Sequence, residues 1–193
     1  LSLETELSPL GIFLIYSLVS GAQKGSDEGT LTLMVGGPAD LVKKADAVLR
    51  GMGKSIFHTG RLGSGHAMKT INNYLAALNL ISALQGLLVG MKYGLDPEQM
   101  TDILNASYGR NMATETVLKQ QVISGKFSAN FKLWLAAKDA RVMAETAQHV
   151  GYTGSLPQDL KALFAAAESE LGRDSDFTNV YKYLDTFWEK PKA

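Results

Sequence analysis

The stretch that decides the fold is "GSGHAMKTINNYLAALNLISALQGLLVGMKYG", residues 63–94, because it separates two kinds of sequence. Before it, short runs rich in Val, Ile, Thr and Phe are bounded by glycine, which is typical of strands. Within it, residues 70–91 carry no charge, and the pattern predicts a helix over 67–93 that stops at Gly94. After it, almost every segment has helical spacing. We therefore expect a mixed chain with strands first and helices afterwards.

The long uncharged helix has two interpretations. Its length meets the test for a membrane span, but several polar side chains would then need partners in lipid, namely Asn72, Asn73, Asn79, Ser82 and Gln85. A helix that is apolar on all faces is more often buried by its neighbours. We therefore expect a central helix and no membrane partner. Because a small domain buries such a helix incompletely, we also expect a homodimer or a higher homo-oligomer.

The chain before this helix indicates a small α/β segment. Residues 11–20, 29–37 and 55–60 predict strands. Between the second and third strands, Pro38 suits a first helical turn, and apolar residues follow at helical spacing: Leu41, Val42, Ala45, Val48 and Leu49. We expect an α/β domain over residues 1–62 and an all-α, multi-helix domain built on the long helix over residues 63–193.

Five further helices are predicted after the long one, over 96–109, 114–125, 130–151, 156–172 and 177–188. Asp96 followed by Pro97 is a typical N-cap and first helical residue. The last helix is predicted to begin with Ser175 or Asp176 as its cap. No strand pattern interrupts this part of the sequence.

Composition excludes several classes of function. Nineteen basic and nineteen acidic residues give no net charge, so neither nucleic acid nor an anionic membrane is suggested as a partner. Without cysteine, the chain has no disulfide, thiolate nucleophile or Cys-type zinc site, which suits a reducing cytoplasm. The three histidines, at 58, 66 and 149, are too widely spaced for a usual metal site. Residues 1–20 carry two glutamates and no basic residue, so they resemble a signal peptide poorly.

One polar cluster opens the long helix. Lys69, Asn72 and Asn73 stand at i, i+3 and i+4 and so share one helical face. This end of the helix could simply be exposed, but two consecutive asparagines are poor helix formers and need a reason. A lysine held beside two amides could act as an acid or a base. Gly63 and Gly65 fail both as a Walker A loop and as a dinucleotide fingerprint, so we interpret them as a tight turn into the helix.

The motif "GRLGSGHAMKTINN", residues 60–73, resembles the G-x-G-x-x-x-K-x-x-N-N signature of the β-hydroxyacid dehydrogenases. This family includes 3-hydroxyisobutyrate dehydrogenase, tartronate semialdehyde reductase and, more distantly, 6-phosphogluconate dehydrogenase. Two further stretches are similar to family motifs in the same order. They are "VSGAQKGSDEGTLTLMVGG" at 19–37, a substrate loop with its following strand, and "FKLWLAAKDARVMAETAQHVG" at 131–151.

The resemblance implies NAD(P)-dependent interconversion of a β-hydroxyacid and its semialdehyde. It makes Lys69 the catalytic lysine and Asn73, with Asn72 beside it, a substrate contact. Ser20 and Gly21 would bind the substrate carboxylate. Lys138 would lie on the cofactor side, although Lys138 and Asp139 could equally be a solvated charge pair. Imine reductases share this fold but usually lack the lysine, so Lys69 favours a hydroxyacid substrate.

The resemblance also has gaps. Family members carry about a hundred residues before the serine-glycine loop, including a glycine-rich dinucleotide fingerprint that does not occur in this sequence. Residues 1–18 look unlike the family, and Ala22 replaces the loop's second glycine. The expectation is therefore a remnant of a Rossmann-type domain over 1–62, with weak or no NAD(P) binding and impaired activity. The alternative function is a non-catalytic, helical dimerisation module. Neither the substrate nor the choice between NAD and NADP follows from the residues.

Overall fold

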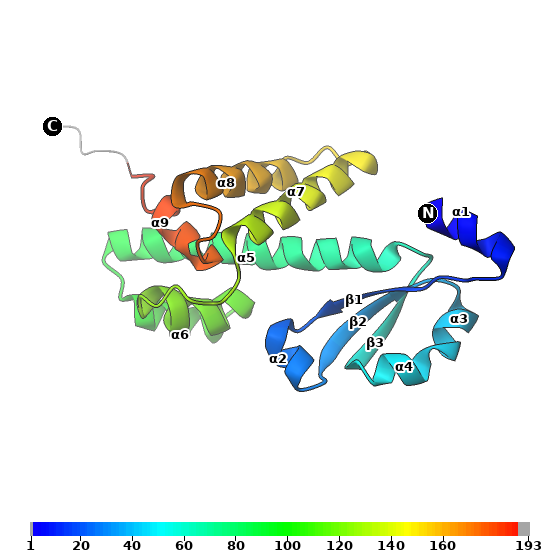
Figure 1. Cartoon of the computed structure of the whole chain (residues 1–193). Helices are drawn as coiled ribbons and strands as arrows, with labels where there is room; N and C mark the ends of the chain where they lie inside the picture. Colours follow the sequence, from blue (N-terminus) through cyan, green and yellow to red (C-terminus); the bar gives the residue numbers. More distant parts are fainter. Residues whose placement is uncertain (1, 189–193) are drawn as a thin grey trace. The chain divides into compact units, whose positions relative to one another are not determined.

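A computed structural model describes residues 2–188. The chain forms two compact units that meet between Asn72 and Asn73, inside the long helix (Figure 1). The predicted boundary lies ten residues earlier, at residue 62, where the last strand has ended and the helix has not yet begun. A single helix thus supplies residues to both units, and each unit is described by itself below.

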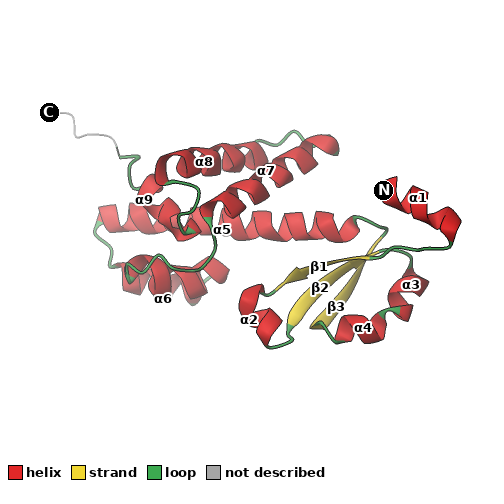
Figure 2. Ribbon diagram, viewed as in Figure 1, coloured by secondary structure: helices red, strands yellow, loops and turns green. Residues whose placement is uncertain are grey.

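The first unit is a three-stranded sheet with short helices (Figure 2). In chain order it contains α1 (Ser2–Leu7), the 3-10 turn η1 (Ser8–Leu10), β1 (Tyr16–Ser20), α2 (Ala22–Asp27), β2 (Leu31–Gly36), α3 (Ala39–Lys44), α4 (Asp46–Arg50) and β3 (Gly53–Gly60). The strand order is β1-β2-β3, with β1 antiparallel and β3 parallel to the central β2. Leu33 and Val35 of β2 form its core with Val42 and Leu49 of the following helices.

Two details of this unit differ from the sequence prediction. The helix α2 was not expected, because "AQKGSD" contains glycine and little apolar periodicity. The single helix predicted after Pro38 is two short helices that meet at Ala45, where ψ is −2°. The two short helices run in different directions (Figure 1), and Val48, which was expected on the apolar face, is 70% exposed.

The second unit is helical. It contains most of α5 (Ser64–Tyr93), then α6 (Pro97–Asn105), the π-helix η2 (Ala113–Ile123), α7 (Leu133–His149), α8 (Leu156–Leu171), the 3-10 turn η3 (Phe177–Asn179) and α9 (Val180–Leu184). The expected all-α architecture on a long central helix is therefore confirmed, with the last predicted helix divided into η3 and α9. The π-helix replaces the α-helix expected over 114–125.

The core of the second unit explains why residues 70–91 of α5 carry no charge. Leu80, Leu84 and Leu87 of α5 are fully buried in one cluster with residues of the later helices. A row of small residues on α7 is also buried, namely Ala136, Ala140, Ala144 and Ala147. Small side chains at i, i+4 spacing let a neighbouring helix approach closely, and α8 lies along α7 (Figure 1).

Both predicted helix caps are present. The Asp96 carboxylate accepts a hydrogen bond of 2.8 Å from the backbone N–H of Gln99 at the start of α6. At the start of η3 the cap is Asp176, whose carboxylate accepts from the backbone N–H of Thr178 at 3.0 Å. Each acceptor satisfies a backbone donor that has no partner within the helix. These caps fix where two helices begin.

The two glycines at the start of α5, Gly63 just before it and Gly65 in its first turn, have separate structural roles. Gly63 has a φ of +91°, a conformation that other residues rarely adopt. Gly65 is buried, and a Cβ at this position would overlap the carbonyl oxygen of Met34 in β2. The Thr59 and Ser64 hydroxyls, 2.7 Å apart, join the end of β3 to the start of the helix. The sequence therefore turns at Gly63 and packs against the sheet at Gly65.

By length and composition alone, α5 could cross a membrane. The core helix of a soluble protein meets the same criterion, and α5 contributes six residues to the buried cluster: Leu80, Ile81, Ala83, Leu84, Leu87 and Leu88. Over the most apolar 18-residue stretch of α5, 39% of the residues are buried inside the structure.

Candidate active site

The first unit places the predicted carboxylate loop at the end of β1. Ser20 is the last residue of that strand, opposite Thr32 of β2, and it is half-buried. Gly21 follows with a φ of +133°, a conformation that requires glycine. A Cβ on Gly21 would also lie 3.2 Å from a methyl carbon of Leu31. The turn therefore ends the strand abruptly and leaves a hydroxyl and a backbone N–H next to each other.

The same unit contains Lys69 and Asn72, in the second and third turns of α5. Both side chains are half-buried, and both make further interactions. The close packing of Gly65 on β2 fixes the N-terminal turn of α5 against the sheet. Lys69 lies four residues after Gly65, so it stands about one turn above this anchored point. The predicted acid–base residue is therefore held by a rigid element and not by a loop.

The second unit brings together three polar side chains from two helices. The amide Nδ2 of Asn73 on α5 donates a 2.8 Å hydrogen bond to Oδ2 of Asp139 on α7. The other oxygen of Asp139, Oδ1, pairs with Nζ of Lys138 at 2.6 Å. One carboxylate thus orients an amide and an ammonium at the same time. Bonds in which one partner is charged are shorter and stronger than neutral ones.

Burial distinguishes this arrangement from a solvated charge pair. The Asp139 side chain is only 14% exposed, whereas that of Lys138 is 44% exposed. A carboxylate at this depth needs hydrogen-bonding partners, and Asn73 supplies one from a different helix. Asp139 therefore has a partner on a second helix in addition to its ion pair with Lys138. The sequence indicated Asp139 only as the neighbour of Lys138. No pattern in the sequence predicted its contact with Asn73.

Lys69 and Asn73 are related through the helix that carries both. Because α5 is continuous from Ser64 to Tyr93, the two residues lie one turn apart on the same helical face. Asn73 is half-buried, and its bond to Asp139 holds the amide plane. The pair of Lys69 and Asn73 is suited to proton transfer and to hydrogen bonding of a hydroxyl or carbonyl.

Among the residues that the structure describes, no three His, Asp or Glu side chains gather as a potential metal site. His58 contacts the backbone carbonyls of Gly37 and Gly60, at 2.8 and 3.1 Å. The ring of His66 packs edge-on against Tyr16, with centroids 5.1 Å apart. These two histidines have structural contacts within the first unit.

Two protein-family models together match the chain almost from end to end. The description "NAD-binding of NADP-dependent 3-hydroxyisobutyrate dehydrogenase" matches residues 63–184. The description "NAD binding domain of 6-phosphogluconate dehydrogenase" matches residues 2–60. The second match includes most of the segment 1–18, which the motifs alone had set apart from the family. The likeness therefore extends further towards the start of the chain than the sequence motifs indicated.

Individual relatives agree with these matches. The chain is 37% identical over 153 residues to 2-(hydroxymethyl)glutarate dehydrogenase of Eubacterium barkeri, which covers 79% of this chain and 50% of the relative. It is 33% identical over 181 residues to 3-hydroxyisobutyrate dehydrogenase of Pseudomonas aeruginosa, covering 89% and 60% respectively. Among solved structures, 3-hydroxyisobutyrate dehydrogenase of Mycobacterium tuberculosis with L-serine matches at a TM-score of 0.86 and 25% identity. That match covers 95% of this chain and 65% of the other.

Proposed function

The chain belongs to the β-hydroxyacid dehydrogenase family, and we propose that it carries the substrate-binding and proton-transfer residues for NAD(P)-dependent interconversion of a β-hydroxyacid and its semialdehyde. The observation that supports this most directly is the Asn73–Asp139 hydrogen bond. It fixes an amide one helical turn after Lys69, which matches the family's catalytic lysine. The chain spans about half to three fifths of the length of these relatives, so the activity is a proposal for this chain.

In the proposed oxidation, Lys69 acts as the base. Its neutral amine accepts the proton of the substrate hydroxyl while the carbon that bears this hydroxyl loses a hydride, and the C–O bond becomes a carbonyl. In the reverse direction, the ammonium of Lys69 returns the proton to the carbonyl oxygen. Asn73 hydrogen-bonds the same oxygen and keeps it within reach of the lysine. Ser20 and Gly21 bind the substrate carboxylate through a hydroxyl and a backbone N–H.

NAD(P) is the cofactor class of the family, and when bound it accepts or donates the hydride. The residues of this chain fit the substrate side of such a reaction, because the donors described above are an ammonium, an amide, a hydroxyl and a backbone N–H. The 193 residues contain no G-x-G-x-x-G fingerprint, so we assign no residue to the pyrophosphate. Lys138 is the proposed contact on the cofactor side, and Asp139 positions it through their 2.6 Å ion pair.

Substrate binding tests the proposal on the chain itself. Calorimetric titration with 3-hydroxyisobutyrate, L-serine and 2-(hydroxymethyl)glutarate should show that at least one of them binds. We expect Lys69→Ala and Ser20→Ala each to weaken that binding about tenfold or more, because each removes one charge-assisted contact. The matched control is Lys92→Ala, since Lys92 lies near the other end of α5, over the ring of Trp188.

Turnover and cofactor binding are measured on the same variants. NAD(P)H formation should fall by about 10²–10⁴-fold in Lys69→Ala relative to Lys92→Ala, which is the usual contribution of a general base. The affinity for NAD(P) should be the same in both variants. Normal turnover in Lys69→Ala would remove this lysine from the mechanism. Failure of all three acids to bind would contradict the proposed substrate class.

We also propose that the chain forms a homodimer through α5. Exposed residues of this helix recur at spacings of seven, four and three, namely Leu75, Ser82, Gly86 and Val89. Spacing of this kind is typical of helices that pair along a shared seam, and Val89 at its end is 61% exposed. Leu75→Glu and Val89→Glu should therefore shift the mass measured by light scattering from dimer to monomer, whereas Lys92→Glu should not. A monomeric wild type would refute the dimer.

A further inference from the structure

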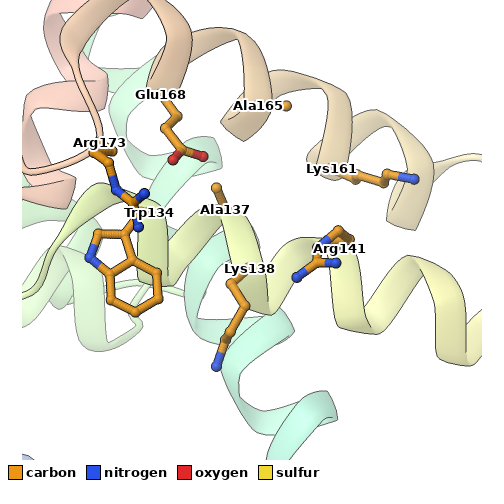
Figure 3. Close-up of a pocket in the computed structure, with 8 residues that line it drawn as sticks. All are labelled: Trp134, Ala137, Lys138, Arg141, Lys161, Ala165, Glu168 and Arg173. Carbon is orange, nitrogen blue, oxygen red and sulfur yellow. The ribbon is translucent and has the colours of Figure 1, made fainter.

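The groove between α7 and α8 contains a pocket that shares only Lys138 with the proposed active site. Its volume is about 280 Å³. Six of its lining side chains are charged or aromatic, and we call the open space that they line the α7–α8 pocket: Trp134, Lys138, Arg141, Lys161, Glu168 and Arg173 (Figure 3). Two alanines, Ala137 and Ala165, leave room between the helices. Four cationic side chains and one carboxylate thus line a single concave space.

This concentration of positive charge is local. The whole chain has equal numbers of basic and acidic residues. Ion pairs satisfy two of the four cations, Lys138 with Asp139 at 2.6 Å and Arg141 with Glu145 at 3.8 Å. Among the described residues, neither Lys161 nor Arg173 has a carboxylate within ion-pair distance. Two cations therefore line the pocket without an acidic partner, and one of them, Lys161, is half-buried.

Arg173 is held in place before any ligand binds. Its guanidinium lies over the ring of Trp134, 5.4 Å from the centroid (Figure 3). Its backbone carbonyl also accepts a 3.1 Å hydrogen bond from the N–H of Trp134 at the start of α7. Gly172, with a φ of +85°, makes the turn that brings Arg173 back towards that helix. A fixed guanidinium loses little conformational freedom when it binds an oxyanion.

We propose that the α7–α8 pocket binds a small oxyanion with two or more negative charges. Guanidinium and ammonium groups are the usual protein ligands of phosphate and carboxylate oxygens. The volume is just below the usual range of ligand pockets, about 300–1,000 Å³, so the ligand is small and not a dinucleotide. A phosphate ester and a di- or tricarboxylate share this chemistry. The carboxylate of Glu168 lies in the same wall and lowers the affinity for any such anion.

The charges of the pocket give a directional test. Pyrophosphate and citrate are titrated into the full chain in a buffer without other multivalent anions, and binding is followed by calorimetry. Lys161→Gln and Arg173→Gln should each weaken binding about tenfold, as expected for one lost charge-assisted contact. Glu168→Gln should tighten it several-fold, because it removes the carboxylate that repels an anion. The matched control, Lys126→Gln, removes an exposed cation elsewhere in the same unit and should leave the affinity unchanged.

Two further measurements locate the bound anion in this pocket. Trp134 lines the pocket, so in a Trp188→Phe variant the remaining tryptophan fluorescence should change on binding. Lys69→Ala should bind the anions normally, because Lys69 belongs to the proposed active site. If pyrophosphate and citrate bind with unequal affinities, the anion that binds more tightly identifies the ligand as a phosphate or as a carboxylate. The proposal is overturned if neither anion binds at about 10 mM, if sodium chloride of equal ionic strength has the same effect, or if Lys161→Gln and Arg173→Gln bind like wild type.

Discussion

Replacing Gly65 with alanine should destabilise the first unit, although alanine is the better helix former. An added Cβ would overlap the carbonyl oxygen of Met34, which belongs to the middle strand of the sheet. Adding a methyl group to a packed interior costs about 1–3 kcal/mol, whereas the helix propensity of alanine returns up to about 1 kcal/mol. The obstacle is backbone held in the sheet and cannot rotate away. The upper end of that cost, about 3 kcal/mol, therefore applies, and subtracting the gain in helix propensity leaves an expected net loss of about 2 kcal/mol.

Gly86→Ala is the matched control in the same helix. A Cβ at Gly86 would meet no atom of its own chain within 4 Å. In the Leu75→Glu background, where the proposed dimer seam does not form, only the gain in helix propensity remains, and stability should rise by about 1 kcal/mol. Gly90→Ala is intermediate, because the added Cβ would meet the flexible end of the Met100 side chain. The three substitutions are chemically identical and differ only in what surrounds them.

The comparison is made by thermal and urea unfolding followed by circular dichroism. For a chain of this size, about 2–4 °C corresponds to 1 kcal/mol. The midpoint should therefore fall by about 4–8 °C for Gly65→Ala and rise by about 2–4 °C for Gly86→Ala. Amide exchange in β2 should accelerate only in the first variant. A Gly65→Ala protein as stable as wild type would show that the helix does not pack this closely on the sheet.

Three further changes have defined outcomes. Asp139→Ala should cost about 1.5–3 kcal/mol in urea unfolding, because it removes a charged acceptor from Asn73. Asp96→Ala should cost about 1 kcal/mol by the same measurement, because the N–H of Gln99 loses its cap. Burial, with a smaller effect of the nearby carboxylate of Asp185, raises the pKa of Tyr181 above 10.0. The folded protein therefore favours the protonated phenol of Tyr181. The stability that this preference provides is fully present below pH 10 and is lost as the pH rises through the raised pKa. Tyr181→Phe should reduce this alkaline loss in unfolding experiments.

A control for Asp139→Ala comes from an exposed side chain. Glu145→Ala removes a carboxylate 3.8 Å from Arg141, with both side chains more than half exposed, and should alter stability by less than about 0.5 kcal/mol. Equal losses in Asp139→Ala and Glu145→Ala would show that the bond to Asn73 contributes nothing. If Tyr181→Phe and wild type lose stability identically as the pH rises, Tyr181 contributes nothing to the alkaline loss of stability.

Local chemistry made several elements predictable. The uncharged run after Thr70 and the stop at Gly94 identified α5, and the Asp96-Pro97 pair identified the start of α6. Caps and breakers act within a few residues, so their effect is visible in the sequence. Other features depend on distant contacts. The break at Ala45 and the exposure of Val48 are set by how two short helices meet the sheet, and no local pattern contains that information.

The sequence by itself determined the division into a strand-rich first part and a helical second part, because hydrophobic periodicity and glycine punctuation are properties of neighbouring residues. It also identified Lys69 and Asn73 as one face of a helix, through their spacing alone. Only the tertiary structure decided that Asn73 is held by Asp139, 66 residues away, and that Gly65 is needed for contact with a strand. It likewise placed Lys161 and Arg173 in the lining of the same pocket as Trp134. Such contacts join residues far apart in the chain, so they exist only once the helices and strands have packed together.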